Sequence, residues 1–521
     1  MEDEIAVDVV WSRMGTKLEH MLTSFTEQDS TSAKLDRPEW MRMYTDVYDI
    51  CVHQTQEYAA DLYERLRDLL IGQLQAQQQA IVPCRGEDLV RQYCQRFDAF
   101  VKATSYIRRI TEYMHRFWIP QQISDGPSEA NIRELNVLVL VEWERVVLRK
   151  VELLLPVMFD LIDRARSGDR VDWDVLSGVI RSFATVGSSN VDEPNHLYTT
   201  CFEEEFLKRA HDYYKTAAEE FLSKNTVPDY MRQVDVWLQE EEDRADSHLQ
   251  KETKPKLQAQ CTKVLIDDFK DTYIQEFVGL VEGNARPDLT IMHKLLKRSK
   301  DSHKPGDSTS LVRTVAKKLE ALISEEGRKM IKAKTDEVVS DIKSFDQVKK
   351  CLPLIKDLTE LHDKYKGLVE QCFDASHIFV QTLDQAFKKF VNTSVGGFNM
   401  SELLAYYCDY LMRSNNRSTE SEMERKLDKI VRLFCYLEDK DLFHESYRRW
   451  LSKRLLNRRE SNTDLEHMMI TKLKENAGFS FTSKLEGMFN DITTSSEIIR
   501  KFKEHSEKLA AQGGTPSSGT S

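Results

Sequence analysis

The sequence predicts an all-α protein of several domains, and three observations carry this prediction. The chain has 521 residues, more than a single compact core usually holds. Its 19 glycines and 12 prolines are about half of ordinary usage, which disfavours a turn-rich β sandwich or barrel. Hydrophobic residues make up 40% and charged residues 31% of the chain, a balance that suits long amphipathic helices with one wet face.

Turn signals divide the chain into helical blocks. The major ones lie near residues 168, 285 and 396, at Ser167-Gly168-Asp169, at Asn284 to Asp288 and at Gly396-Gly397. Blocks of similar length that are built of helices are typical of stacked bundles or of a solenoid. The end of the chain, from Ala510 to Ser521, is rich in Gly, Ser and Thr and has no apolar face, so it is predicted to be disordered.

Apolar residues recur with the period of an α-helix where their spacing can be followed. Leu427, Ile430, Val431, Phe434 and Cys435 stand at positions i, i+3, i+4, i+7 and i+8. This pattern predicts a helix with one continuous buried face.

Charge and cysteine pattern exclude several classes of function. The 74 basic and 86 acidic residues give a formal charge of −12, which disfavours nucleic acid or an anionic membrane as a general partner. No segment approaches the roughly 20 apolar residues that span a bilayer, and Met1-Glu2-Asp3-Glu4 is acidic where a signal peptide is basic. The nine cysteines form no CxxC pair and no Cys-His cluster, so neither a metal site nor a cofactor is predicted. We therefore expect a soluble protein of the cytoplasm or the nucleus.

Nothing in the sequence proposes an enzyme. It contains no glycine loop for phosphate, no GxSxG motif and no kinase-type set of motifs. The acidic run Glu240 to Asp243 points to several sides of a helix and is interpreted as solvated surface. His115, His362 and His444 each lack a second ligand at a suitable spacing and are interpreted as core or surface residues.

Two features stay open between a structural and a functional interpretation. The run Arg448 to Arg459 has six basic residues in twelve, and it either ends a helix, where cations are favoured, or forms a basic surface for an acidic partner. The second feature is a stripe of large side chains at helical spacing, which is either core or a protein-binding surface. Its members are Trp40, Met43, Tyr44, Val47 and Tyr48.

Four stretches of the chain resemble the cullin family. Trp40 to Tyr48 is similar to the second helix of the cullins that serve F-box proteins. Leu437 to Leu456 resembles a family signature in which Asp-Lys-Asp precedes a phenylalanine and a Lys-Arg-Leu-Leu run follows. The block Glu466 to Ile492 is the most specific, and Ser401 to Met412 also fits. The similarity extends from about residue 5 to about residue 505.

The resemblance implies a fold and a division into domains. It implies three stacked five-helix cullin repeats that form a curved stalk, at 1–167, 168–285 and 286–395. A helical bundle that opens the cullin homology domain is expected at 396–505, followed by a short disordered tail at 506–521. The first repeat is the one expected to bind an adaptor.

The resemblance also implies a function, the non-catalytic scaffold of an SCF-type ubiquitin ligase. Such a scaffold holds a substrate-recognition module at one end and, through a RING-box protein, a ubiquitin-conjugating enzyme at the other. It supplies effective concentration and orientation rather than a nucleophile. The implied role lies in ubiquitin-dependent protein degradation, with no cofactor and with neither nucleic acid nor membrane as a partner.

Family contacts to a Skp-type adaptor and its F-box protein lie on the second and fifth helices of the first repeat. By resemblance, the second-helix contacts map onto Trp40, Met43, Tyr44, Val47 and Tyr48. The fifth helix maps onto Tyr106 to Ile119, and exposed contacts are expected at Ile107, Ile110, Thr111, Met114 and His115. Phe117 and Trp118 are expected to be either interface or core. Trp40 stands where a tyrosine is usual and Met43 where a leucine is usual, which leaves the identity of the adaptor open.

The chain departs from the family pattern at its end. In the family, an α/β subdomain that takes a strand from the RING-box protein and winged-helix domains with a modifiable lysine follow the bundle. Here the tail follows Lys501 to His505, with no alternating strand pattern and no candidate neddylation lysine. Because an added strand needs a sheet to receive it, we expect residues 1–521 to recruit a RING-box protein poorly and to act as a partial scaffold or a competitor. The alternative is a fragment of an ordinary ligase scaffold.

Two other functions fit parts of the sequence. A helical tether of vesicle trafficking shares the length, the acidity and the helices, but has no reason to carry the block Glu466 to Ile492. A nucleic-acid-binding helical repeat would use Arg448 to Arg459, and its binding would depend steeply on salt.

Overall fold

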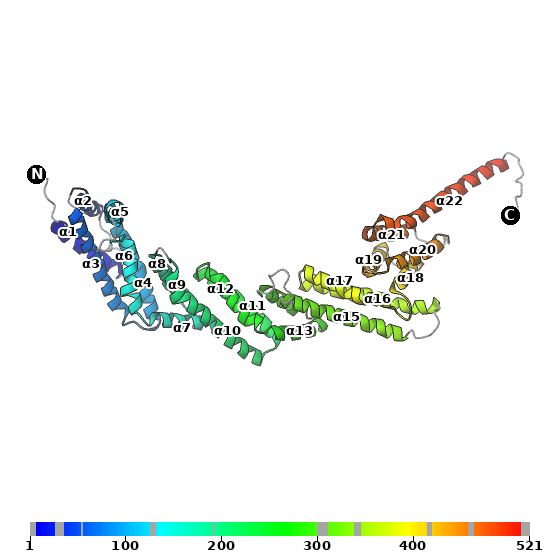
Figure 1. The fold of residues 1–521 in the computed structure, drawn as a ribbon, viewed down its shortest axis with the longest axis horizontal. Coiled ribbons are helices and arrows are strands. Elements are labelled where there is room, and N and C mark those ends of the chain that lie inside the picture. The colour runs from blue at the N-terminus through cyan, green and yellow to red at the C-terminus, as the bar shows by residue number, and fades with distance from the viewer. Residues whose placement is uncertain are drawn as a thin grey trace. The chain divides into compact units, whose positions relative to one another are not determined.

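The computed structural model describes residues 7–26, 36–53, 56–124, 132–190, 193–299, 311–337, 345–413, 419–456 and 463–511. Within these ranges the regular structure is helical, and the one β feature is an isolated antiparallel bridge between Val395 and Phe398. The all-α prediction is therefore confirmed (Figure 1). Contacts divide the chain into a first unit, Met1–Asp268, and a second unit, Phe269–Ser521, which we describe separately.

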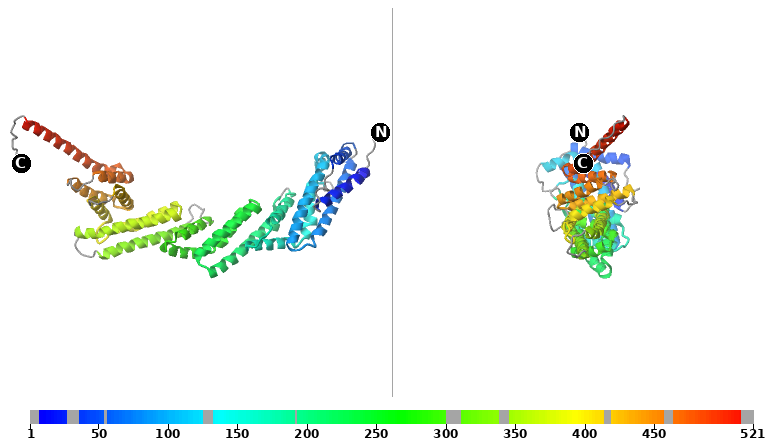
Figure 2. Two further views of the ribbon diagram at one scale, coloured as in Figure 1. Left: turned by 180° about the vertical axis from the view of Figure 1, so that it is seen from behind. Right: turned by 90° about the vertical axis from the view of Figure 1, so that its right-hand side faces the viewer.

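The first unit opens with helices that lie together in both long views (Figures 1 and 2). Helix α4 is central among them because it packs against α1, α6 and α7. These elements are α1 (Val7–Thr26), α2 (Arg37–His53), α3 (Gln56–Ile81), α4 (Gly86–Ile110), the π-helix η1 (Met114–Trp118), α5 (Ile119–Ser124), α6 (Leu135–Val146), the 3-10 helix η2 (Leu148–Lys150) and α7 (Leu154–Arg166).

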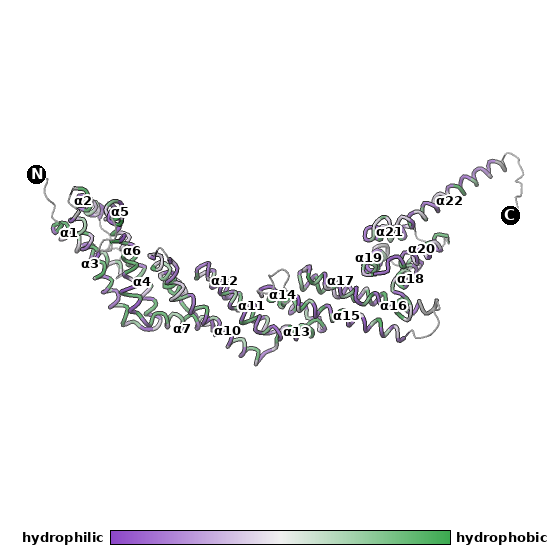
Figure 3. The backbone as a smooth tube through the Cα atoms, viewed as in Figure 1, coloured by the Kyte–Doolittle hydropathy of each residue, from purple (hydrophilic) through white to green (hydrophobic). Residues whose placement is uncertain are grey.

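The remaining helices of the first unit follow α7 without a strand among the described residues. They are α8 (Trp173–Gly187), α9 (His196–Tyr198), the π-helix η3 (Thr199–Glu203), α10 (Glu204–Lys224), α11 (Val227–His248), α12 (Thr253–Thr262) and the π-helix η4 (Lys263–Asp267). Apolar and polar residues alternate along these helices, as expected for amphipathic elements (Figure 3).

Trp143 of α6 marks the core of the opening group. Its side chain is fully buried, and its ring centroid lies 5.1 Å from that of Phe97 and 5.9 Å from that of Phe100. A buried indole N–H needs an acceptor, and Nε1 of Trp143 donates to the hydroxyl of Tyr93 at 3.1 Å. The hydroxyl of Tyr93 also lies 3.2 Å from Oγ of Ser182, so the contacts of this core continue onto α8.

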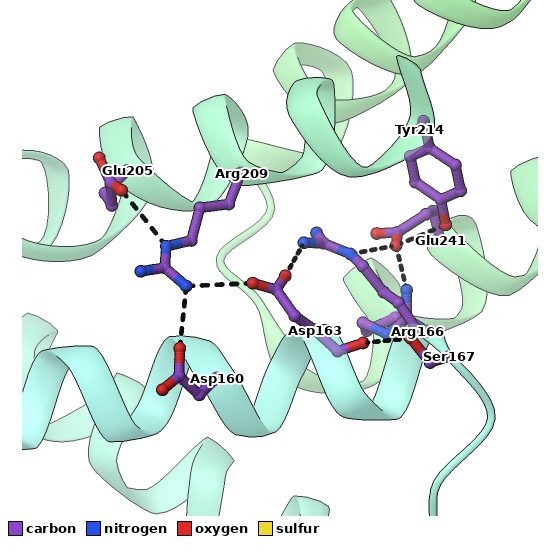
Figure 4. Close-up of polar contacts among 9 residues, drawn as sticks. Asp160, Asp163, Arg166, Ser167, Glu205, Arg209, Tyr214 and Glu241 are labelled. Carbon is purple, nitrogen blue, oxygen red and sulfur yellow. Dashed lines mark hydrogen bonds and ion pairs between the residues drawn. The ribbon is translucent and has the colours of Figure 1, made fainter. Parts of the chain in front are cut away.

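A network of ion pairs joins α7 to α10 and α11 (Figure 4). The side chain of Arg166 is fully buried, and it donates from Nε to Glu241 at 2.9 Å and from Nη1 to Asp163 at 3.1 Å. Asp163 also accepts from Arg209 at 3.0 Å, and the hydroxyl of Tyr214 donates to Glu241 at 2.8 Å. We call these five residues the joint network. Because buried charges are stable only when paired, the joint network fixes α7 against α10 and α11.

The second unit continues the helical pattern. Its elements are α13 (Lys270–Glu282), α14 (Arg286–Arg298), α15 (Leu311–Glu337), α16 (Phe345–Cys372), α17 (His377–Val391), α18 (Met400–Arg413), α19 (Glu420–Tyr436), α20 (Lys440–Leu456), α21 (Thr463–Ala477) and α22 (Phe479–Ala511). Helices α15 and α17 approach closely at Gly327, where a Cβ would lie 2.5 Å from the ring of Phe390.

The apolar stripe that the sequence places after residue 426 lies on α19. Leu427, Ile430, Val431 and Phe434 are buried, and Cys435 is half-buried at the edge of the stripe. The predicted helix and its buried face are therefore confirmed.

The helical part of the chain extends further toward the C-terminus than predicted. Helix α22 continues to Ala511, so residues 506–511 are helical, and the rest of the predicted tail lies outside the described residues. The four-domain division is untested by these contacts and stays a prediction. Among the described helices, none is both long and apolar enough to cross a bilayer.

Candidate functional site

Helix α2 begins at a well-defined cap. The carboxylate of Asp36 accepts a hydrogen bond from the backbone N–H of Glu39 at 2.8 Å, and Pro38 lies in the first turn, where its missing N–H costs nothing. These contacts fix where α2 begins.

The predicted stripe on α2 divides between core and surface. Met43 and Val47 are buried, with 4% and 0% of their surface exposed, and Ile50 continues this face. Trp40, Tyr44 and Tyr48, at i, i+4 and i+8, are half-buried on the adjoining face. The resemblance predicted all five residues as adaptor contacts, whereas the structure places Met43 and Val47 in the core.

The half-buried rings of α2 are continuous with rings from the segment after α4. Trp40 stacks on Tyr44 with ring centroids 5.6 Å apart. Tyr48 meets Tyr113 edge to face at 4.7 Å, and Tyr113 lies 4.6 Å from Phe117, which is 51% exposed. We call these five residues the aromatic strip, and it is the candidate functional site.

The structure corrects the expectation that the fifth helix of the repeat exposes its contact residues. Ile107, Ile110, Thr111, Met114 and His115 are all buried, none with more than 4% exposure, and Trp118 is buried beside them. These residues lie on the apolar face by which this segment packs into the first unit. Phe117 is exposed and Tyr113 is half-buried, and of the other residues in this stretch Arg109 and Arg116 are exposed.

The polar members of this buried face are neutral or satisfied locally. Thr111 donates its hydroxyl to the carbonyl of Ile107 at 3.0 Å. Burial, helped by the nearby Arg108 guanidinium, lowers the pKa of His115 to about 4. His115 is therefore a neutral core side chain at neutral pH rather than a contact available to a partner.

Cations border the aromatic strip. The guanidinium of Arg116 lies 5.7 Å from the ring centroid of Phe117, and Arg109 lies 5.7 Å from that of Tyr106. Both arginines are exposed. On α2, burial raises the pKa of Asp46 although Arg13, at 3.6 Å, partly opposes this shift. Of these cations, Arg116 is the one that lies against a ring of the strip.

Sequence reasoning missed Tyr113 and left Phe117 undecided. Both could have been found from their i, i+4 spacing, which places two rings on one face of a helix. Rings at the surface with arginines beside them are what protein-binding surfaces enrich. The arrangement suits binding, and none of its residues forms a nucleophile and base pair.

Comparison with known proteins gives the context of this site. A family model described as the cullin alpha solenoid domain matches residues 15–499. Cullin-1 of Dictyostelium discoideum is 30% identical over 97% of this chain and 66% of its own length. Cullin-1 of Caenorhabditis elegans is 28% identical over 97% of this chain and 67% of its own length. Cullin-1 of Schizosaccharomyces pombe is 26% identical over 89% of this chain and 61% of its own length.

The chain spans about two thirds of the length of the curated relatives it matches. The family match covers most of the chain, including both units and the aromatic strip. The chain therefore belongs to the cullin family.

Proposed function

We propose that this chain is a non-catalytic scaffold of an SCF-type cullin-RING ubiquitin ligase and that it docks a Skp-type adaptor with its F-box protein. The aromatic strip is the docking surface. The proposal places its action in the cytoplasm or the nucleus, in ubiquitin-dependent protein degradation. Its support is the membership in the cullin family together with relatives that bear the name Cullin-1.

The observation that carries the proposal is the exposed ring surface built by α2 and η1. Trp40, Tyr44 and Phe117 offer apolar area at the surface of the first unit, whereas Met43, Val47 and Met114 of the same elements are buried. Large aromatic residues at such positions commonly supply most of the binding free energy of an interface. The buried residues then act as positioning residues, and the rings make the contact.

The chemistry of a scaffold is positional. Holding two reacting partners on one body converts an encounter in solution into a local event and raises their effective concentration. The described residues of this chain need supply no acid, base or nucleophile for that purpose. What they must supply is a docking surface whose rings are already in place before the partner arrives.

Adaptor capture tests the proposal. The change is Tyr44→Ala combined with Phe117→Ala, and binding of a purified Skp-type adaptor and F-box heterodimer is measured by calorimetry. Because each ring is expected to contribute about 2 kcal/mol or more, the affinity should fall by roughly a thousandfold.

The matched control is Val82→Ala, which removes an apolar side chain that is 40% exposed and outside the strip. It should bind the heterodimer like the unchanged chain. Equal binding by the double variant and the control, with unchanged melting of both, would mean that the adaptor docks elsewhere.

A further inference from the structure

A groove between α18 and α20 in the second unit has no role in the proposed function. It encloses a cavity of about 280 Å³, less than the usual size of a small-molecule site. Its floor is apolar, because Phe398, Leu403 and Tyr406 are buried and the half-buried Trp450 lies 5.4 Å from the ring of Tyr406. The cavity therefore has room for one large apolar side chain.

The rim of the groove is mainly basic. The ammonium of Lys453 lies 4.5 Å from the ring centroid of Trp450. The guanidinium of Arg413 lies 5.7 Å from the same ring but is already paired with Asp409 at 2.9 Å. Arg449 lines the groove beside them with 73% of its side chain exposed, and Glu402 is the one acidic residue of the lining. Arg449 forms a long ion pair with Glu445, at 3.6 Å. Among the described residues, Lys453 has no carboxylate within ion-pair distance.

The structure divides the basic run Arg448 to Arg459 that the sequence left open. Arg454 is fully buried and pairs with Glu466 and Asp409, so it is structural. Arg448 pairs with Glu445 at 2.9 Å. Arg449 and Lys453 instead face the groove. Residues 457–459 lie outside the described residues. Helix capping by cations thus does not account for the whole run.

We propose that the groove between α18 and α20 docks an acidic segment of a partner protein that inserts one large aliphatic or aromatic side chain onto Trp450 and Tyr406. The cations on the rim attract carboxylates on both sides of the inserted side chain, and the cavity selects the side chain itself. Basic residues slightly outnumber acidic ones in the second unit, whereas the first unit is strongly acidic, so the attraction is local to this part of the chain.

Nucleic acid fits the same groove less well. The formal charge of −12 of the whole chain and the carboxylate of Glu402 at the rim both repel a polyanion. A peptide, in contrast, can place its few carboxylates next to the cations of the rim. Its apolar side chain also uses the enclosed floor, which a phosphate backbone would leave empty.

The test uses the full chain and a defined probe. The probe is a short fluorescein-labelled peptide with one central phenylalanine and three aspartates on each side, and its binding is followed by fluorescence polarisation. Two variant peptides accompany it, one with alanine in place of phenylalanine and one with lysines in place of the aspartates. The expected result is saturable binding of the probe, weakening on the order of tenfold without the phenylalanine, and no binding of the lysine peptide.

The protein variants assign the binding to the groove. Arg449→Glu combined with Lys453→Glu changes two exposed side chains and should weaken probe binding at least about tenfold. The matched control Lys388→Glu reverses an exposed cation on α17, outside the groove, and should leave binding within about twofold. Equal weakening by both variants would overturn the proposal, as would equal binding of the phenylalanine and alanine peptides. Tighter binding of a single-stranded oligonucleotide of the same charge would also overturn it.

Discussion

Arg454 is the side chain that ties three helices of the second unit together. It is fully buried on α20, donates to Asp409 of α18 at 2.6 Å and to Glu466 of α21 at 3.0 Å, and lies 5.5 Å from the ring of Tyr447. Burial alone would lower its pKa, but the bonds to Glu466 raise the pKa above its ordinary value. The buried guanidinium of Arg454 is therefore charged, and its stability depends on every one of its partners being in place.

Removing this cation should destabilise the second unit strongly. Arg454→Met leaves Glu466 and Asp409 as buried charges without their partner, and the free energy of unfolding should fall by about 3–5 kcal/mol. Urea denaturation followed by circular dichroism measures the loss. Arg448→Met is the control, because Arg448 is exposed and its pair with Glu445 should contribute about 1 kcal/mol or less. Similar losses in both variants would contradict the assigned role of Arg454.

Met114 and Phe117 should behave oppositely on truncation. Met114 is fully buried, so Met114→Ala should lower the free energy of unfolding by about 2–5 kcal/mol through the cavity it leaves. Phe117 is 51% exposed, and Phe117→Ala should change stability by about 0.5 kcal/mol or less while weakening adaptor binding. Thermal melting and calorimetry separate the two effects. If Met114→Ala lost adaptor binding but kept its stability, the result would contradict the buried position of Met114 and favour the exposed position expected from the sequence.

Buried histidines should make stability depend on acidity. Burial, with smaller effects of nearby charges, lowers the pKa of His115, His293 and His362 from 6.5 to about 4. Between these values the unfolded chain binds protons that the folded chain does not, so stability falls as pH drops from about 6.5 to about 4. Each histidine contributes at most about 1.4 kcal/mol per pH unit.

The pH dependence is measured by urea denaturation at several pH values. His362→Gln removes the titrating group that lies 3.0 Å from the hydroxyl of Tyr436, and it should flatten the profile. His377→Gln changes an exposed histidine of the same unit and should leave the slope as it was. A profile that does not change slope in the His362→Gln variant would contradict this origin of the acid sensitivity.

At the scale of elements, the sequence predicts where helices form better than it predicts which face of each helix is buried. The periodicity of α19 is confirmed because its buried face follows one regular helix. The exposure expected for the fifth-helix residues was wrong, because an apolar residue looks the same in the sequence whether it lies in the core or at an interface, and neighbouring helices decide between the two. The joint network was likewise beyond prediction, because Arg166 and Glu241 lie 75 positions apart.

The joint network should hold α7, α10 and α11 as a coupled set. Burial would raise the pKa of Glu241, but Arg166 and Arg244 hold that pKa below its ordinary value, so the carboxylate is charged. Glu241→Gln should lower the free energy of unfolding of the first unit by about 3–5 kcal/mol, because Arg166 is then a buried cation with a weakened partner. Chemical denaturation of the full chain measures this loss.

A double variant distinguishes coupling from simple loss of packing. Arg166→Met combined with Glu241→Met removes both buried charges, so its effect should be smaller than the sum of the two single effects. Strict additivity would show that the two side chains contribute independently and would contradict a shared network.

At the scale of the whole molecule, the two candidate binding surfaces belong to different units. The aromatic strip lies in the first unit, and the groove between α18 and α20 lies in the second. The family match extends over both units, from residue 15 to residue 499. Substitutions in one surface therefore leave the residues of the other unchanged.

Hydrogen exchange with and without a bound Skp-type adaptor and F-box heterodimer tests the central claim most directly. If the aromatic strip is the docking surface, deuterium uptake falls in α2 (Arg37–His53) and in η1 (Met114–Trp118), and stays unchanged in α10 and α11. Protection elsewhere in the chain, with α2 and η1 exchanging as in the free protein, would contradict the account.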